Sequence, residues 1–390
     1  MKLNWMSTAD TLCEDDFDLE EKYSIKTPGS SPIIHEDYIF FGSTNGSFKS
    51  VNKNTGDLEW EFFTGAVKHP KGILSTPTIK DTSVWFGAYD GCLYELDVYT
   101  GEKKGKYELC NWIGSSPIII DDLLVIGLEY KRIVSGPIKG IEKEVEGGSI
   151  TGFNIKTKKI EWEIPNKTYT HGSASYNKQL DIFVCGTNDS IVYAFNSEGN
   201  IINTLECGGP VKYAPLMIDN YAIFGSHDGS LNIWDYIVNE LVYTSGEETH
   251  RTSKGKFNIP IYTTPVFINN KIYANNISGK LFCYDNNVVG KYELNEQIHG
   301  PLTKWKNNLF IPTKNGNVIV FDTSNPYITE SNIGTSTSFA KSSTIYGTNF
   351  GRISHRWKIS ENSIYRRPLV KDGIMYVVDN KDTIFCSDIG

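Results

Sequence analysis

Residues 30–63 read SSPIIHEDYIFFGSTNGSFKSVNKNTGDLEWEFF, and this stretch is the most informative about the fold. It holds four strand-length segments, and the middle two are joined by Asn45-Gly46, the dipeptide that a two-residue hairpin favours. The second segment, YIFFG, is apolar without alternation, so both of its faces must be covered. The stretch therefore predicts a four-stranded antiparallel unit that packs against similar units on either side.

The same unit recurs along nearly the whole chain. Helical periodicity is nearly absent, and Gly, Asn and Asp interrupt the sequence too often for long helices. Further copies open at residues 75–77, 115–117, 173–175, 214–215, 263–265, 300–301, 336–338 and 367–368, so that nine units are counted. The pattern predicts an all-β protein: a single closed β-propeller of four-stranded blades spanning residues 1–390.

The last unit, residues 367–389, has only three strand-length segments. We expect residues 15–26 to supply its missing fourth strand and to close the ring, with residues 1–14 flexible before it. Closure of this kind removes sheet edges that would otherwise invite aggregation.

The motif KNTGDLEW at residues 53–60, and more weakly KTKKIEW at 156–162, combines with the Ser-Ser-Pro openings. This combination resembles the repeat of quinoprotein propellers of the pyrroloquinoline-quinone type, for which eight blades are the norm. The resemblance implies that Trp60 and Trp162 pack between neighbouring blades. The dehydrogenases of that family carry an adjacent-cysteine disulfide and a calcium site. This sequence has no adjacent cysteines and no recognisable calcium set, so no cofactor is predicted.

Composition narrows the functional classes. The formal net charge is -8, which disfavours binding to nucleic acid or to an anionic membrane. The N-terminal residues have no apolar core of a signal peptide, and no apolar run is long enough to cross a bilayer. We therefore expect a soluble, cytoplasmic protein. The seven cysteines show no zinc-type spacing and are expected to be reduced thiols, with no metal bound.

Two insertions, residues 131–146 and 245–260, are expected on one face, which we call the top face. Propellers usually carry function where long loops gather. The residues near the expected innermost strands are conspicuously basic for an acidic chain. The candidate ligand-binding residues are Lys26, His69, Lys71, Trp112, Lys212, Tyr262, Arg251, Arg366 and Arg367. Lys131, Arg132, Lys254 and Lys256 would extend this cationic mouth, whereas Glu142, Glu144, Glu146, Glu247 and Glu248 in the same loops could neutralise it.

His171 and His299 both precede a glycine at equivalent repeat positions. They are candidates for a general acid and base, or for two metal ligands, facing each other across the channel. Repeat symmetry alone would give the same pattern, and no acidic residue of matching register is evident.

These observations favour a non-catalytic binding or scaffold propeller that recognises a protein, a peptide or a small anionic ligand through its top face and channel mouth. The first alternative is an enzyme, most plausibly a lyase, isomerase or hydrolase, with its active site in the channel. A degenerate quinone- or calcium-binding propeller is the second. An enzyme needs His171, His299 and Lys212 within reach of one small substrate, whereas a binding face tolerates them spread around a ring.

Overall fold

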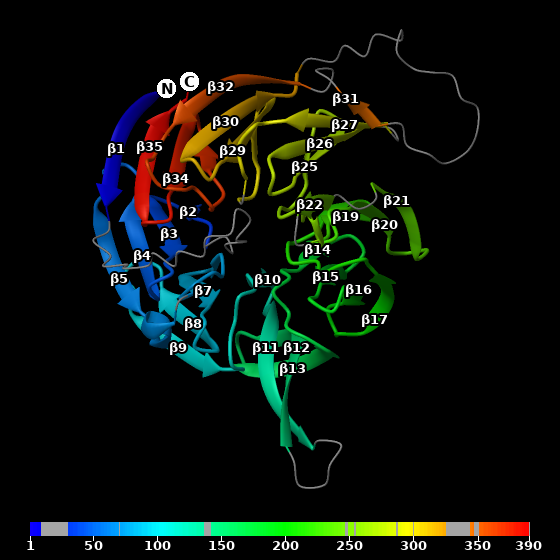
Figure 1. The fold of residues 1–390 in the computed structure, drawn as a ribbon. Coiled ribbons are helices and arrows are strands. Elements are labelled where there is room, and N and C mark those ends of the chain that lie inside the picture. Colours follow the sequence, from blue (N-terminus) through cyan, green and yellow to red (C-terminus); the bar gives the residue numbers. More distant parts are fainter. Residues whose placement is uncertain are drawn as a thin grey trace, which may run out of the picture.

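The computed structural model describes residues 1–8, 30–69, 71–135, 142–245, 249–252, 255–285, 288–298, 300–324, 344–346 and 351–389. In this part of the chain, eight four-stranded blades stand around a central axis and form one β-propeller (Figure 1). A single turn of 3-10 helix, Gly65–Lys68, is the one helix in the described ranges. The predicted all-β propeller is confirmed.

The blades, numbered 1 to 8, follow one another in chain order, with strands given from the axis outward. Blades 1 to 4 are β2–β5 (Ile33–His35, Tyr38–Gly42, Ser47–Asn52, Leu58–Phe63), β6–β9 (Thr78–Lys80, Ser83–Gly87, Cys92–Asp97, Lys103–Glu108), β10–β13 (Ile118–Ile120, Leu123–Ser135, Glu142–Asn154, Lys159–Asn166) and β14–β17 (Ser175–Asn177, Ile182–Gly186, Ile191–Asn196, Ile201–Glu206). Blades 5 to 7 are β18–β21 (Leu216–Ile218, Tyr221–Gly225, Leu231–Asp235, Glu240–Thr244), β24–β27 (Val266–Ile268, Lys271–Asn275, Lys280–Asp285, Val288–Glu293) and β28, β29, β30 and β32 (Thr303–Trp305, Asn308–Pro312, Asn317–Asp322, Arg352–Lys358). Blade 8 is β33, β34, β35 and β1 (Leu369–Lys371, Ile374–Val378, Thr383–Asp388, Lys2–Thr8).

The apolar second strands are covered by the neighbouring blades. All five residues of β7 are buried, whereas exposed and half-buried residues alternate along β9, the outer strand of the same blade. Between blades 1 and 2, the rings of Phe48 and Phe86 stack with centroids 4.0 Å apart. Trp60 Nε1 donates to the Val98 carbonyl of the next blade at 3.2 Å, and Trp162 Nε1 donates to the Ser197 carbonyl at 2.9 Å. Both tryptophans thus bridge neighbouring blades.

Eight blades replace the nine repeat units counted in the sequence. The extra unit was residues 334–360. Its last part is β32, the outer strand of blade 7, which pairs with β30. A short segment before it, β31 (Thr344–Tyr346), pairs in parallel with β27 as a fifth strand of blade 6. The long connection between β30 and β32 made one strand of an existing blade read as a separate hairpin.

The fourth strand of blade 8 comes from earlier in the chain than predicted. β1 (Lys2–Thr8) pairs antiparallel with β35, beside the C-terminal end of the chain (Figure 1). Residues 2–8, predicted to be flexible, are therefore a strand. The predicted closing segment, residues 15–26, lies outside the described residues.

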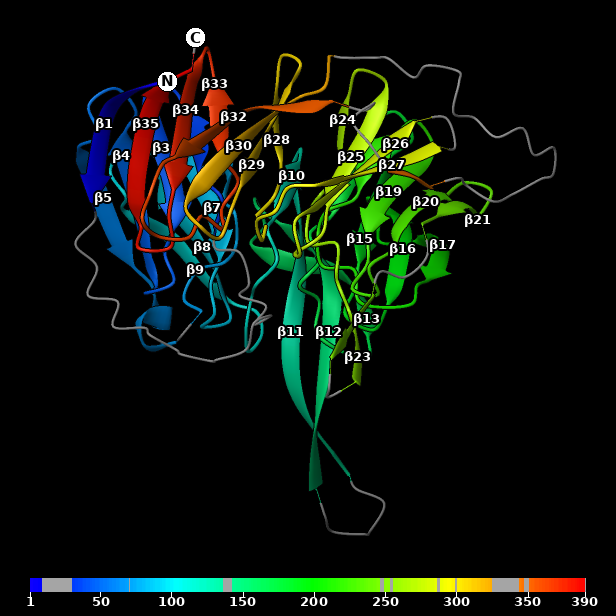
Figure 2. The ribbon, with the colours of Figure 1, turned by 45° about the horizontal axis from the view of Figure 1, so that its top comes forward.

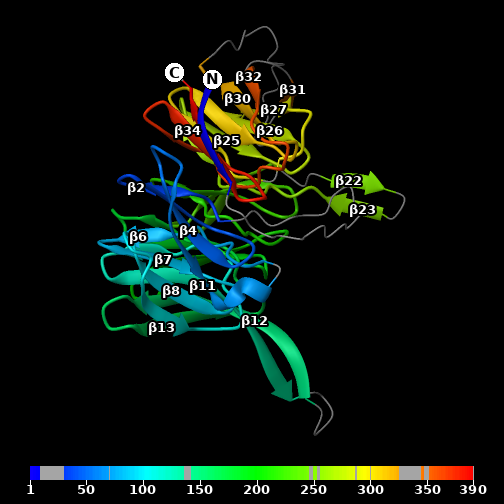
Figure 3. The same ribbon diagram turned by 90° about the vertical axis from the view of Figure 1, so that its left-hand side faces the viewer.

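Two hairpins project from one face of the ring. β11 and β12 have 13 residues each and extend well beyond blade 3. Between blades 5 and 6, β22 (Thr249–Thr252) and β23 (Gly255–Asn258) form a separate two-stranded ribbon. Both point away from the ring on the same side, seen in two views (Figures 2 and 3). They belong to the two sequence insertions expected on the top face.

Candidate functional site

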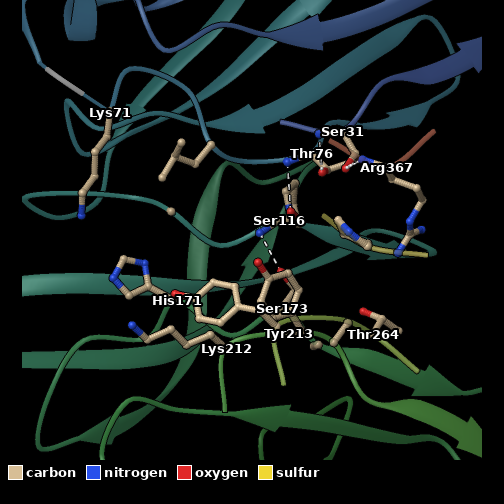
Figure 4. Close-up of a pocket in the computed structure, with 17 residues that line it drawn as sticks. Ser31, Lys71, Thr76, Ser116, His171, Ser173, Lys212, Tyr213, Thr264 and Arg367 are labelled. Atoms are coloured by element: carbon tan, nitrogen blue, oxygen red, sulfur yellow. Dashed lines mark hydrogen bonds between the residues drawn. The ribbon is translucent and has the colours of Figure 1, made fainter. Parts of the chain in front are cut away.

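The channel at the centre of the ring contains a cavity of about 300 Å³, with residues of all eight blades in its wall (Figure 4). One set of wall residues is the residue two positions before each innermost strand, which lines the cavity in all eight blades. In blade order from 1 to 8, these residues are Ser31, Thr76, Ser116, Ser173, Ala214, Thr264, Pro301 and Arg367.

Hydroxyl groups line one side of this ring of residues. Each one accepts a hydrogen bond from the backbone N–H of the neighbouring blade, so its own proton is left to donate to something in the cavity. Arg367 N donates to Ser31 Oγ at 3.3 Å, Ser31 N to Thr76 Oγ1 at 3.0 Å, Thr76 N to Ser116 Oγ at 2.9 Å and Ser116 N to Ser173 Oγ at 3.0 Å. We call Ser31, Thr76, Ser116 and Ser173 the hydroxyl arc.

A second set of wall residues stands two positions earlier in each opening loop. Leu74, Gly114, His171, Lys212 and Tyr262 come from blades 2 to 6 at this level and contact the same cavity. Lys71, from the loop that precedes blade 2, completes the wall. Figure 4 shows Lys71, His171 and Lys212 on one side of the cavity and Arg367 on the other.

Behind His171 lies a polar cluster made by three blades. His171 Nδ1 is 3.1 Å from Glu129 Oε1 and 3.4 Å from the Tyr89 hydroxyl. The Tyr89 hydroxyl is 3.5 Å from Lys71 Nζ, and that amine lies 4.9 Å from the centre of the tyrosine ring. Tyr89, Glu129, His171 and Lys71 therefore form one connected group at the cavity wall, which we call the channel cluster.

Gly114 allows this close approach. A Cβ at position 114 would stand 2.8 Å from His171 Nδ1, 2.9 Å from the Tyr89 hydroxyl and 3.0 Å from Glu129 Oε1. These distances are below van der Waals contact, so any larger residue would push the three polar groups apart. The glycine of this opening loop is thus required by packing against the channel cluster.

Burial controls the protonation of the cluster. Loss of hydration raises the pKa of Glu129 to about 7, although Lys71 and Lys212 act in the opposite direction. The same loss of hydration, reinforced by the nearby charges of Lys212 and Lys71, lowers the pKa of His171 to about 3. Burial and the charge of Lys71 also lower the pKa of Lys212. At neutral pH the histidine is uncharged, and Glu129 is close to its midpoint.

Among the described residues, the buried polar atoms that make no hydrogen bond include two on residues that contact the cavity wall. These two are Glu129 Oε1, despite its short distance to His171, and His227 Nε2. The ring of His227 packs against Tyr262, a wall residue, with centroids 4.8 Å apart. Buried polar groups in native proteins normally have a partner, so these two atoms point to a ligand or water in the channel.

The raised pKa of Glu129 predicts a pH dependence of stability. Its pKa is about 7 in the folded protein against a reference of 4.5, so between these pH values only the unfolded chain has released the proton. Relative to Glu129→Gln, the wild-type free energy of unfolding should therefore fall as pH rises from 4.5 to 8, by roughly 3 kcal/mol. Urea unfolding of both proteins checks this. The comparison with Glu129→Gln separates the effect of Glu129 from that of His171, whose lowered pKa makes stability rise with pH. A difference in unfolding free energy between the two proteins that does not change with pH would contradict the raised pKa of Glu129.

Five predicted residues meet at the cavity: Lys71, His171, Lys212, Tyr262 and Arg367. Two more are close by. The ring of His69 lies 4.9 Å from that of Tyr89, and the Trp112 backbone pairs with that of Glu129. Lys26 and His299 lie outside the described residues. Arg251 is in β22, with its side chain also outside them.

Arg366 was wrongly placed at the mouth. It is 3% exposed, and its Nη2 donates to Asp382 at 2.6 Å between blades 8 and 1. Adjacent residues of an extended segment point to opposite sides, so Arg367 reaches the channel and Arg366 does not.

Tyr89, Glu129 and His227 were not among the residues predicted from the sequence, and Glu129, the acidic residue next to His171, stands in a different repeat register from the histidine. All three occupy one repeat position, two residues after the glycine that follows the apolar part of the second strand: Gly87, Gly127 and Gly225. Aligning that position across the repeats would have found them. Among the described residues, no group of three or more His, Cys, Asp or Glu could hold a metal ion.

No family model matches the chain. A stretch of 100 residues, 25% of the chain, is 33% identical to the mouse (Mus musculus) beta-alanine-activating enzyme, and covers 9% of that enzyme. Since the match spans under a tenth of that relative, it does not place the chain in a family.

Solved structures share the fold at low identity. The computationally designed Ika8 protein has a TM-score of 0.65 at 15% identity, over 93% of this chain and 96% of that one. BamB from Moraxella catarrhalis has a TM-score of 0.62 at 13% identity, over 92% of this chain and 93% of that one. A europium-containing methanol dehydrogenase has a TM-score of 0.63 at 12% identity, over 96% of this chain and 84% of that one. These likenesses show that the chain shares the β-propeller fold of the three proteins. In the described part of the chain, no helix is long and apolar enough to span a membrane.

Proposed function

We propose that this propeller is a binding protein whose central cavity takes a small anion bearing a carboxylate or phosphate group. The supporting observation is the set of three cationic side chains at one cavity, Lys71, Lys212 and Arg367, in a protein of net charge -8. Among the described residues, none of the three has a carboxylate within ion-pair distance. Cations at one cavity that make no ion pair with the described carboxylates favour an anionic ligand.

The cavity wall supplies further complementary groups. The hydroxyl arc has protons to donate, and the peptide N–H groups behind it hold the hydroxyls in place. The one carboxyl group of the channel cluster is close to its midpoint at neutral pH and so can become neutral when an anion enters. A volume of about 300 Å³ is at the small end of the range for small-molecule sites. A protein or peptide partner would meet the top face, where the two hairpins project. We propose a cytoplasmic location for the protein, as expected from the sequence.

The test is a thermal-shift screen of acetate, succinate, phosphate and pyrroloquinoline quinone against the uncharged analogues acetamide and succinamide. Ligand at about 100 times Kd adds roughly 2.7 kcal/mol to stability, so a bound anion should raise the melting temperature by several degrees. Lys212→Met should abolish the shift. Lys103→Met, an exposed lysine on the outer strand β9, is the matched control and should keep it. An equal shift in all three proteins, or none in the wild type, would reject the cavity as an anion site.

A second candidate function is acid–base catalysis on the bound anion. Glu129, with a pKa of about 7, and the neutral His171 stand 3.1 Å apart at the wall, an arrangement suited to proton transfer near neutral pH. NMR spectra of each bound anion over time would detect turnover. If the site is catalytic, Glu129→Gln should stop turnover while the anion still binds. If the wild type turns over none of the anions that it binds, the catalytic function is rejected and the binding function stands.

A further inference from the structure

We infer that the ligand of the central cavity carries two anionic groups, one held by Arg367 and the other by Lys71 and Lys212, with an apolar segment between them. This inference rests on the proposed anion site and specifies its ligand class. The ligand would be a small dicarboxylate, or a molecule with one carboxylate and one phosphate or phosphonate end.

The first observation is that the cations stand in two separate places. Arg367 belongs to blade 8, and blade 4, which supplies His171, lies directly across an eight-bladed ring. Lys212 comes from blade 5, next to blade 4, and its side chain lies on the same side of the cavity as that of Lys71. Figure 4 shows Arg367 on the side of the cavity opposite Lys71 and Lys212. A ligand with a single acid group can neutralise only one of these places.

The second observation concerns the contacts of Arg367. Its backbone N–H donates to Ser31 Oγ, whereas the guanidinium makes no ion pair among the described residues. Its neighbour Arg366 instead takes the nearby carboxylate of Asp382. Arg367 is exposed to the cavity, yet protein surrounds it, and the resulting loss of hydration lowers its pKa. A cation at a cavity wall that makes no ion pair with the described residues favours an anionic partner.

The third observation is the asymmetric wall between the two places. The hydroxyl arc runs through blades 1 to 4, from the neighbour of Arg367 to the blade of His171. The opposite side, blades 5 to 7, presents two aromatic rings and two small apolar residues beside Lys212 and Thr264: Tyr213, Tyr262, Ala214 and Pro301. The rings of Tyr213 and Tyr262 are in edge-to-face contact, with centroids 5.1 Å apart. Such a wall suits a ligand with an apolar middle, whose ends alone need charged partners.

Isothermal titration calorimetry with matched ligands tests the inference. Butyrate has one acid group, glutarate has two on a chain of similar length, and 3-phosphonopropionate replaces one of the two by a phosphonate. Wild-type protein should bind the two doubly charged ligands at least 10-fold more tightly than butyrate. Arg367→Met should remove that advantage and change butyrate binding less than about 2-fold, whereas Lys212→Met should weaken all three ligands. The control is Arg352→Met, an exposed arginine of the outer strand β32, which should change none.

The possible results separate this inference from the proposed function. If glutarate and 3-phosphonopropionate bind no better than butyrate, or if Arg367→Met weakens all three ligands equally, the two-anion ligand is overturned while the anion site stands. If no ligand binds the wild type, or if Lys212→Met changes no affinity, the anion site itself is rejected. A preference between the two doubly charged ligands that depends on Arg367 identifies which acid group the arginine prefers.

Discussion

Replacing Asp382 by alanine is expected to lower the free energy of unfolding by about 3 to 5 kcal/mol, the usual cost of removing one partner of a buried ion pair. Asp382 is 4% exposed. Its carboxylate accepts from Arg366 Nη2 at 2.6 Å and from the Ser43 hydroxyl, and it lies 3.8 Å from Lys49 Nζ. These residues join blade 8 to blade 1. Without Asp382, the buried arginine would have no counter-ion among the residues that the structure describes, and of these Lys49 would keep Glu61 alone, at 3.6 Å.

Equilibrium urea unfolding measures this effect, and Asp122→Ala is the matched control. Asp122 forms an ion pair with Lys156 at 2.7 Å on the surface, where the lysine side chain is 75% exposed. Exposed ion pairs contribute little to stability, so the control should unfold at nearly the wild-type urea concentration. Equal losses in the two variants would mean that the junction of blades 8 and 1 does not depend on this carboxylate.

Deleting residues 1–8 is expected to destabilise the protein by at least about 3 kcal/mol and to cause self-association. β1 is the outer strand of blade 8, and its removal exposes the hydrogen-bonding edge of β35. It also removes Trp5, whose ring packs on Tyr376 with centroids 6.2 Å apart. The same indole occupies the space next to Gly56 of blade 1, where any Cβ would collide with it. Trp5 therefore connects the last blade to the first.

Urea unfolding together with size-exclusion chromatography measures both consequences. Leu3→Ser/Met6→Ser is the control, because both side chains are more than half exposed and the strand pairing stays intact. That variant should elute like the wild type and have nearly unchanged stability. A monomeric deletion variant that unfolds at the wild-type urea concentration would show that blade 8 is complete without β1.

Much of the fold was predictable because each blade repeats local turn chemistry. Asn45-Gly46 and its equivalents determine the hairpins, and the unbroken apolar second strands require neighbours on both faces. The number of blades was not predictable in this way. The outer strand of blade 7 follows a long connection, and strand pairing across such a gap depends on contacts that a local pattern does not contain. The same reason explains why β1 was missed as the partner of β35.

Residues of the candidate site could be predicted from the sequence only where their position in the repeat places them at the channel. His171 and Lys212 stand at equivalent positions of the opening loops, and the sequence placed them near the channel. Glu129 enters the site because this part of β11 in blade 3 lies next to a loop of blade 4, a contact between units rather than within one. The different positions of Arg366 and Arg367 depend on the side to which each side chain points. Burial, which controls the pKa of Glu129, is a property of the assembled ring.

The most direct test of the central claim is an anomalous-difference map of crystals soaked in bromide. We expect a bromide peak in the central cavity, in contact with the side-chain nitrogens of Lys71 and Lys212. This peak should be absent from crystals of Lys212→Met. Bromide peaks confined to the outer surface, with none in the cavity of the wild-type protein, would contradict the assignment of the channel as an anion-binding site.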